Sequence, residues 1–140
     1  MKTKKPTTWA EALDYLKQGN ERFINGHQEH SSPEAVNLLK SLAEKGQRPF
    51  AIILSSSDSR APAETLFDVD LGDLFVVRVA GNVVAPSLLA SIEFAASQFE
   101  TPLLVVMGHT QCGAITTAVD CEGHFCHDLS LNLQELIGRI

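Results

Sequence analysis

Two short polar segments of the sequence contain side chains that could do chemistry. Asp58 and Arg60 follow a run of three serines, and His109 and Cys112 lie three residues apart in a second segment. An imidazole and a thiolate suit zinc, which prefers nitrogen and sulfur donors in tetrahedral geometry. Two such residues are a weak signal by themselves, because a histidine and a cysteine at this spacing are more often simple neighbours. The chemistry therefore depends on whether the fold brings the two segments together.

The apolar pattern predicts a fold that places both segments at one edge of a sheet. Continuous apolar runs, typical of strands covered on both faces, occur at 50–54, 74–79 and 103–107, and a helical pattern fills 87–99. Strands that alternate with helices indicate an α/β fold with a parallel sheet and helices on both faces. In such sheets ligands bind at the carboxyl ends of the strands, where both polar segments fall. Arg78, inside the second run, is expected to be paired structurally.

Helical signals lie on either side of this core. A capping box of Thr8 and Glu11 predicts a helix over 9–23. A second helix is expected over 32–46, because a Ser-Pro pair can start it and Gly46 can end it. A third is expected over 113–119.

The length and composition fit a single domain. The chain has 140 residues, of which 44% are hydrophobic, and this is enough for a core. We expect residues 1–46 to form a helical arm and residues 47–140 an α/β core that is short at its C-terminal end. The helix from Trp9 to Phe23 has a strong apolar stripe, and the shortened chain has fewer elements of its own to cover it, which predicts a dimer or a larger assembly.

The charge and the apolar runs exclude some classes of partner. A net charge of −6 argues against nucleic acid and against an anionic membrane surface. No apolar run approaches the roughly 18 residues of a membrane helix, and the N-terminus lacks the apolar region of a signal peptide. We therefore expect a cytoplasmic protein.

The cysteines predict thiol or metal chemistry rather than a disulfide framework. Their number is three, and an odd count in a cytosolic chain favours free thiols or metal ligands. Cys121, His124, Cys126 and His127 place four soft donors in seven residues and could hold a second metal. The alternative is a polar loop in which these residues coincide, and the spacing alone leaves both open.

Several longer motifs together resemble the β-class carbonic anhydrases. They are "SSDSR", "GDLFVVRVAGN", "SIEFA" and "VVMGHTQCGA", and the similarity begins at "LKQGNERFINGH" and keeps the family's order over most of the chain. The resemblance implies a zinc lyase that converts carbon dioxide reversibly to bicarbonate and works as a dimer or tetramer with an N-terminal arm. The family usually continues past "LNLQELIGRI", so we expect either a natural short form or a fragment.

The resemblance also implies roles for individual residues. The family pattern is C-x-D-S-R followed by H-x-x-C, in which the two cysteines and the histidine hold zinc. His109 and Cys112 match the downstream ligands. Asp58 and Arg60 match the pair in which the arginine holds the carboxylate and decides whether the site is open. The first ligand position is occupied by Ser56.

Ser56 changes the expected metal site. A serine hydroxyl is neutral near pH 7 and is a poor zinc donor. Losing one of four ligands would remove roughly 3 kcal/mol, or about a hundredfold in affinity. Zinc would then be held by Asp58, His109 and Cys112, with the fourth position left for water. Asp58 would be a permanent ligand rather than the partner of Arg60.

Three functions remain open at this point. The first is hydration of carbon dioxide at a zinc site weakened by Ser56. The second is a catalytically inactive pseudo-enzyme that keeps the fold and the oligomer surface. The third is a hydrolase that uses Ser56 or Ser57 with His109 and Asp58, which requires contact between the nucleophile and the base.

Overall fold

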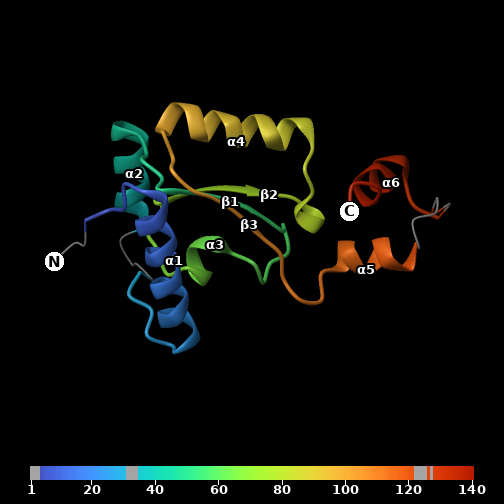
Figure 1. Ribbon diagram of the computed structural model, residues 1–140, viewed down its shortest axis with the longest axis horizontal. Coiled ribbons are helices and arrows are strands. Elements are labelled where there is room, and N and C mark those ends of the chain that lie inside the picture. The colour runs from blue at the N-terminus through green and yellow to red at the C-terminus, as the bar shows by residue number, and fades with distance from the viewer. Residues whose placement is uncertain (1–3, 31–34, 122–125, 127) are drawn as a thin grey trace.

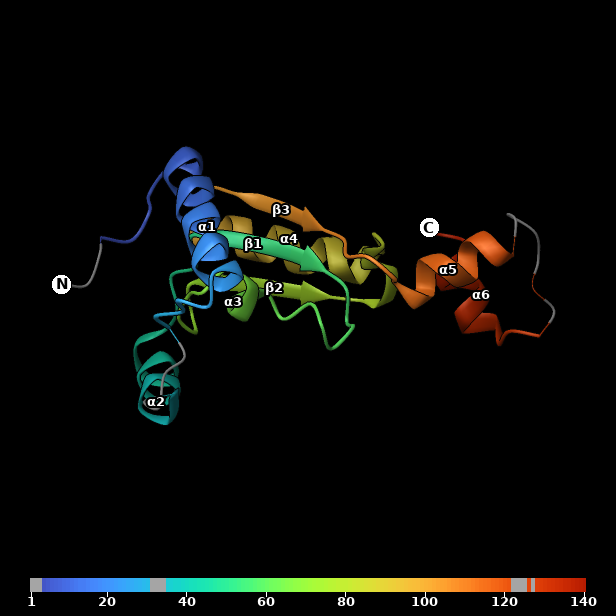
Figure 2. The same ribbon diagram turned by 90° about the horizontal axis from the view of Figure 1, so that it is seen from below.

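The core of the protein is a parallel sheet of three strands. The computed structural model describes residues 4–30, 35–121, 126 and 128–140. The strands β1 (Ala51–Ser55), β2 (Leu74–Arg78) and β3 (Leu104–Met107) are arranged in the order β2-β1-β3 (Figures 1 and 2). Ile53, at the centre of β1, pairs with Val76 on one side and Val105 on the other. The prediction of a parallel sheet built from these three runs is confirmed.

The central strand β1 is buried on both faces. Its residues Ile52 and Leu54 pack against α4 (Pro86–Phe99), and the alternate residues pack against α1 (Trp9–Ile24) and α3 (Ala63–Leu66). Figure 1 shows α4 on one side of the sheet and α1 and α3 on the other. Burial on both faces is the physical reason why this run is apolar without alternation.

The first helix packs on the chain's own sheet. Thr8 and Glu11 form the predicted capping box, and Gly26 adopts a left-handed conformation (φ 69°) just past the end of α1. Ala12 and Leu16 are buried in the same cluster as residues of β1. The sheet of the same chain thus covers part of the apolar stripe of α1, while Trp9 at the start of the helix is 62% exposed.

The remaining helices include three that the sequence analysis did not predict. The helices α2 (Ala35–Lys45) and α5 (Gly113–Asp120) match the patterns at 32–46 and 113–119. In addition to α3, the chain forms the 3-10 helix η1 (Ala80–Asn82) and α6 (Leu131–Ile137). These elements have three to seven residues, which is too short for helical periodicity to emerge. Figure 2 shows α5 and α6 beyond the carboxyl end of the sheet.

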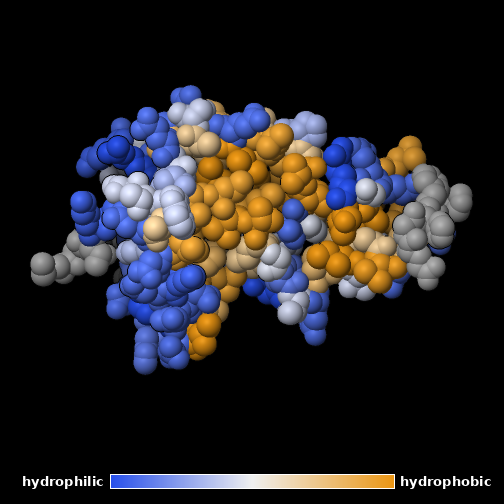
Figure 3. Space-filling view, viewed as in Figure 1, coloured by the Kyte–Doolittle hydropathy of each residue, from blue (hydrophilic) through white to orange (hydrophobic). Residues whose placement is uncertain are grey.

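The sheet has an exposed apolar edge at β3. Leu104 and Val106 are 47% and 60% exposed, although they lie on the face of the sheet that α4 covers over β1 and β2. Figure 3 shows a continuous apolar surface where β3 and α4 meet.

In the described part of the chain, no helix is both long and apolar enough to cross a bilayer.

A buried carboxylate ties the end of α1 to the end of α3. Asp68 accepts a hydrogen bond from Nε of Arg22 at 2.5 Å and from the backbone N–H groups of Glu29 and His30 at 3.1 and 3.0 Å. Burial alone would raise the pKa of Asp68, but these hydrogen bonds, led by that of Arg22, outweigh it and lower the pKa from 3.8 to about 2. The network fixes the segment that follows α1.

The structure corrects the expectation for two of the three cysteines. Cys121 and Cys126 form a disulfide, with their Cα atoms 5.9 Å apart, and among the described residues Cys112 is the free thiol. A Cα separation of 5.9 Å lies within the range that a disulfide requires, and the two residues are five apart in the sequence. His124 and His127 lie outside the described residues. Oxidised sulfur is not a thiolate donor, so the suggested second metal site loses two of its four ligands in this form.

We predict an acid-dependent loss of stability that depends on Asp68. The pKa of Asp68 is lowered in the folded state, so its contribution is complete at neutral pH and is lost as the pH falls from about 5 towards 2. The difference corresponds to roughly 2 kcal/mol of the free energy of unfolding. Urea unfolding across this range should show the loss in the parent and not in Asp68→Asn. The control Asp14→Asn, at an exposed position of α1, should keep the parent's pH dependence.

The disulfide predicts the number of titratable thiols. Protein denatured without reductant should react with one equivalent of a thiol reagent per chain, and reduced protein should react with three. The matched variant Cys112→Ser should give none before reduction and two after it. Three reactive thiols in the unreduced parent would show that the Cys121–Cys126 bond does not form.

Candidate active site

The first half of the site is the loop that follows β1. The buried strand ends at Ser55, and Ser56, which is 2% exposed, begins the loop. The backbone N–H of Ser57 donates to Val79 O at 3.2 Å, which continues the ladder between β1 and β2 by one more bond. This places the next residue, Asp58, at the carboxyl end of the sheet, as the apolar pattern predicts.

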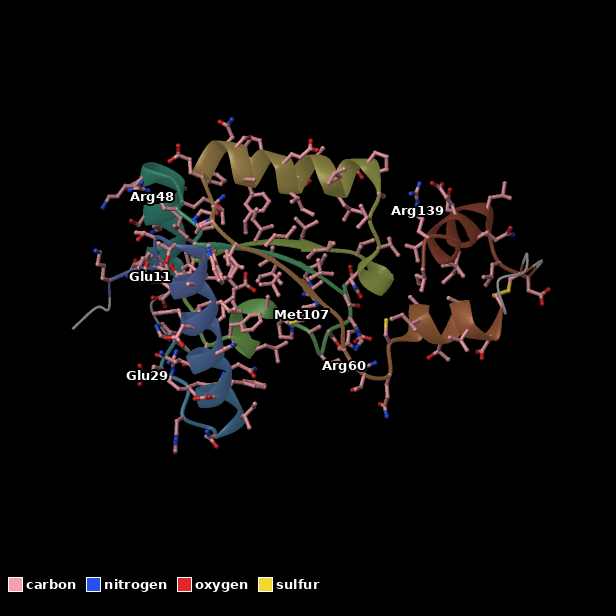
Figure 4. The ribbon with its side chains drawn as sticks, viewed as in Figure 1. Glu11, Glu29, Arg48, Arg60, Met107 and Arg139 are labelled. Carbon is pink, nitrogen blue, oxygen red and sulfur yellow. A yellow bond between two sulfur atoms is a disulfide. The ribbon has the colours of Figure 1, made fainter. Side chains whose placement is uncertain are left out.

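Asp58 and Arg60 form an ion pair across this loop. Nη2 of Arg60 lies 2.9 Å from Oδ2 of Asp58 and also donates to the backbone carbonyl of Gln111 at 2.8 Å. One guanidinium therefore connects the loop after β1 with the loop after β3. Figure 4 shows Arg60 near the carboxyl end of the sheet, while Arg48 lies towards the opposite end of the sheet.

His109 faces the same carboxylate. Its Nδ1 lies 2.9 Å from the carbonyl of Thr110, so this nitrogen donates, and in the neutral imidazole the lone pair is then on Nε2. Nε2 is buried, has no hydrogen-bond partner and lies 3.9 Å from Oδ2 of Asp58. A buried nitrogen lone pair without a partner is unusual and needs an explanation, such as an ion that the fold would hold there.

Cys112 ends the second loop and begins a helix. It is the N-cap residue of α5, is 6% exposed and makes no disulfide. The preceding Gln111 has a left-handed backbone (φ 56°), which turns the chain between His109 and Cys112. Strained backbone of this kind is common where a loop must aim functional side chains.

Ser56 is committed to the loop itself. Its hydroxyl oxygen accepts the backbone N–H of Asp58 at 3.1 Å, an arrangement that closes a tight turn. His109 has no hydrogen bond with Ser56 or Ser57, because Nε2 is unpartnered and Nδ1 is bonded to Thr110. The contact between nucleophile and base that a hydrolase requires is therefore not made.

The residues fit zinc with an incomplete donor set. Nε2 of His109 and the thiol of Cys112 are donors that zinc prefers, and the unpartnered nitrogen is in the tautomer that a ligand needs. Asp58 is already held by Arg60. Within the described ranges, no three His, Cys, Asp or Glu side chains converge on a common metal position. The predicted trio of Asp58, His109 and Cys112 is thus represented by one close approach, between Asp58 and His109.

The structure adds two contributors that the sequence analysis did not assign to the site. Arg78 is paired structurally, as expected, but its partners are the carbonyls of Ser56 and Asp58, at 2.8 and 2.5 Å. The signal was present in the sequence, since a charged residue ends an otherwise apolar strand. Gln111 contributes only its backbone carbonyl, which no side-chain pattern could have indicated.

Curated relatives of this chain are named carbonic anhydrases. A family profile described as carbonic anhydrase matches residues 51–137. Carbonic anhydrase 2 of Mycobacterium tuberculosis is 48% identical over 104 residues, which are 74% of this chain and 49% of that protein. A carbonic anhydrase of Mycolicibacterium smegmatis is 47% identical over 71% of this chain and 48% of its own length. The chain thus spans about half the length of the curated relatives it matches.

Solved structures of β-carbonic anhydrases have the same fold. The β-carbonic anhydrase CafA of Aspergillus fumigatus superposes with a TM-score of 0.61 at 29% identity, covering 91% of this chain and 56% of that one. One of two tetrameric β-carbonic anhydrases of Sordaria macrospora gives 0.61 at 26% identity, covering 92% and 59%. The sequence motifs, the parallel sheet with its loops and these similarities agree, and the chain belongs to the β-class carbonic anhydrase family.

Proposed function

We propose that the protein hydrates carbon dioxide reversibly to bicarbonate at a zinc site that Ser56 weakens. The observation that supports this most directly is the buried, unpartnered Nε2 of His109, which faces Asp58 at 3.9 Å. Burial of such a nitrogen is unfavourable unless a partner occupies its lone pair. Zinc is a partner that suits an imidazole nitrogen with a free thiol three residues further along the chain.

The chain's own residues would prepare this site in three ways. The carbonyl of Thr110 holds the proton on Nδ1 of His109 and so keeps Nε2 available. Cys112 supplies the soft donor at the start of α5. Arg60 holds Asp58 by an ion pair, which keeps the carboxylate beside His109. The ion itself would supply Lewis acidity, which lowers the pKa of water to about 7 and makes hydroxide available at neutral pH.

Ser56 is the reason to expect weak activity. A cysteine at this position would bring a negative charge and a soft donor, whereas the hydroxyl is neutral and already accepts the N–H of Asp58. Asp58 would have to leave Arg60 to serve as the third ligand. The alternative function, a pseudo-enzyme that keeps the fold without catalysis, is supported by the absence of a converged group of three donors among the described residues.

We also propose that the protein assembles into a dimer or a larger oligomer. The exposed Leu104 and Val106 on the edge strand β3 support this, because a contiguous apolar surface of this kind usually marks an interaction site. The solved relative from Sordaria macrospora is described as tetrameric.

Light scattering at micromolar concentration should therefore give at least twice the mass of the 15.2 kDa chain. A stable monomer would contradict the assembly.

We predict that Ser56→Cys strengthens zinc binding and raises the rate of hydration. Restoring a thiolate should tighten zinc binding by about a hundredfold, since losing one ligand of four removes roughly 3 kcal/mol. Asp58 would then remain with Arg60 instead of being needed as a ligand. The measurements are zinc per chain after dialysis against a chelator and the rate of carbon dioxide hydration.

The matched control is Ser57→Cys, which adds a thiol to the same loop at an exposed position. It should leave zinc affinity within a few-fold of the parent. If Ser56→Cys binds no more zinc than Ser57→Cys, Ser56 does not stand at a ligand position. If it binds zinc and still hydrates no carbon dioxide, the pseudo-enzyme reading holds.

A further inference from the structure

One arginine of β2 binds two backbone carbonyls of the loop that holds Asp58. Nε of Arg78 donates to Ser56 O at 2.8 Å, and its Nη2 donates to Asp58 O at 2.5 Å. The two carbonyls lie on either side of Ser57. A planar guanidinium has its donors in a fixed fork, so it can hold two acceptors at once and fix the distance between them.

The rest of the loop is restrained by a few backbone bonds and by Arg60, which pairs with Asp58 and donates to Gln111 O. The backbone N–H of Ser57 bonds to Val79 O at 3.2 Å, and that of Ala61 bonds to Asp58 O at 3.0 Å. The N–H of Asp58 bonds only to the hydroxyl of Ser56, at 3.1 Å. Of the hydrogen bonds to the backbone of residues 56–58, the two from Arg78 have a charged donor, and such bonds are about twice as strong as neutral ones.

The geometry of the loop determines where the carboxylate of Asp58 points. Oδ2 of Asp58 lies 2.9 Å from Arg60 and 3.9 Å from Nε2 of His109, and a small rotation of the backbone at Asp58 would change both distances. Arg78 contacts neither Arg60 nor His109 through any hydrogen bond of the described structure. Its hydrogen bonds therefore act on them through the backbone of residues 56–58.

We propose that Arg78 is a positioning residue that sets the direction of the Asp58 carboxylate by fixing the carbonyls of Ser56 and Asp58. The proposal deepens the proposed function and, for its role in metal binding, rests on it. Arg78 occupies the last position of β2, in register with Ser55 at the end of β1. Arg78 thus connects the loop of the site to the end of the sheet, which fixes its position.

A purely structural role for Arg78 predicts a different outcome. If the side chain only stabilised the end of β2, its loss would lower the stability of the whole sheet, and the loop and strand amides would be affected alike. If Arg78 positions the loop, replacing it should open the loop locally while the strands stay closed. Local and global opening can be separated by backbone amide hydrogen exchange.

The test compares Arg78→Lys, Arg78→Met and the control Arg139→Lys in the metal-free protein. Arg139 is a suitable control because it also donates to a backbone carbonyl, that of Val84 at 3.4 Å, away from the loop. Lysine keeps the charge but can bond to one carbonyl at a time, and methionine can bond to neither. The variants therefore form a graded series.

We expect exchange at the amides of Ser57, Asp58 and Ala61 to be about tenfold faster in Arg78→Lys and about a hundredfold faster in Arg78→Met. The amides of Ile53 and Val77, within the strands, should stay within about twofold of the parent. Arg139→Lys should leave both sets unchanged. Loop amides that do not respond, or loop and strand amides that accelerate in parallel, would overturn the positioning role.

A second measurement concerns zinc and is independent of turnover. Competition with a chelator should show zinc affinity about tenfold lower in Arg78→Met than in the parent, with Arg139→Lys unchanged. Equal affinities in parent and Arg78→Met would refute the link between Arg78 and the metal site. If neither the parent nor Ser56→Cys binds zinc, the proposed function fails, whereas the exchange series still decides whether Arg78 holds the loop.

Discussion

The burial of β1 between two layers is the constraint on which the rest of the structure depends. All five residues of this strand are buried, with β2 and β3 on its edges and α4, α1 and α3 on its faces. A strand enclosed in this way cannot shift its register without moving apolar side chains on both faces. The loop that follows β1 therefore starts at a fixed position, and this fixes the position of the Asp58 backbone.

Two arginines fix the loops of the site by bonding to backbone carbonyls. Arg60 spans from Asp58 to the carbonyl of Gln111, and Arg78 holds the carbonyls of Ser56 and Asp58. Both guanidiniums use the same property, a rigid set of donors that matches several acceptors. The two loops of the site are thus connected by polar contacts at the end of an apolar core.

The sequence predicted elements in which apolar residues recur at a regular spacing. It did not predict features that depend on single contacts between residues. The apolar runs predicted β1, β2 and β3, and the capping box predicted the start of α1, because these signals are local. The elements α3, η1 and α6 were missed because they are too short to show a period. The pairing of Cys121 with Cys126 was missed because a count of cysteines contains no distances. The covering of α1 by its own sheet depends on tertiary packing that spacing does not encode.

The open edge of β3 also affects the colloidal behaviour of the chain. Among the described strands, β3 has a neighbour on one side only, and Leu104 and Val106 expose apolar surface on it, which favours association with other copies. The net charge of −6 opposes this attraction at neutral pH. Salt at about 0.1 M confines that repulsion to roughly 10 Å, and acidification towards the isoelectric point near 5.3 removes it. The balance between a short-range attraction and a screened repulsion thus sets the range of buffers in which the protein stays dispersed.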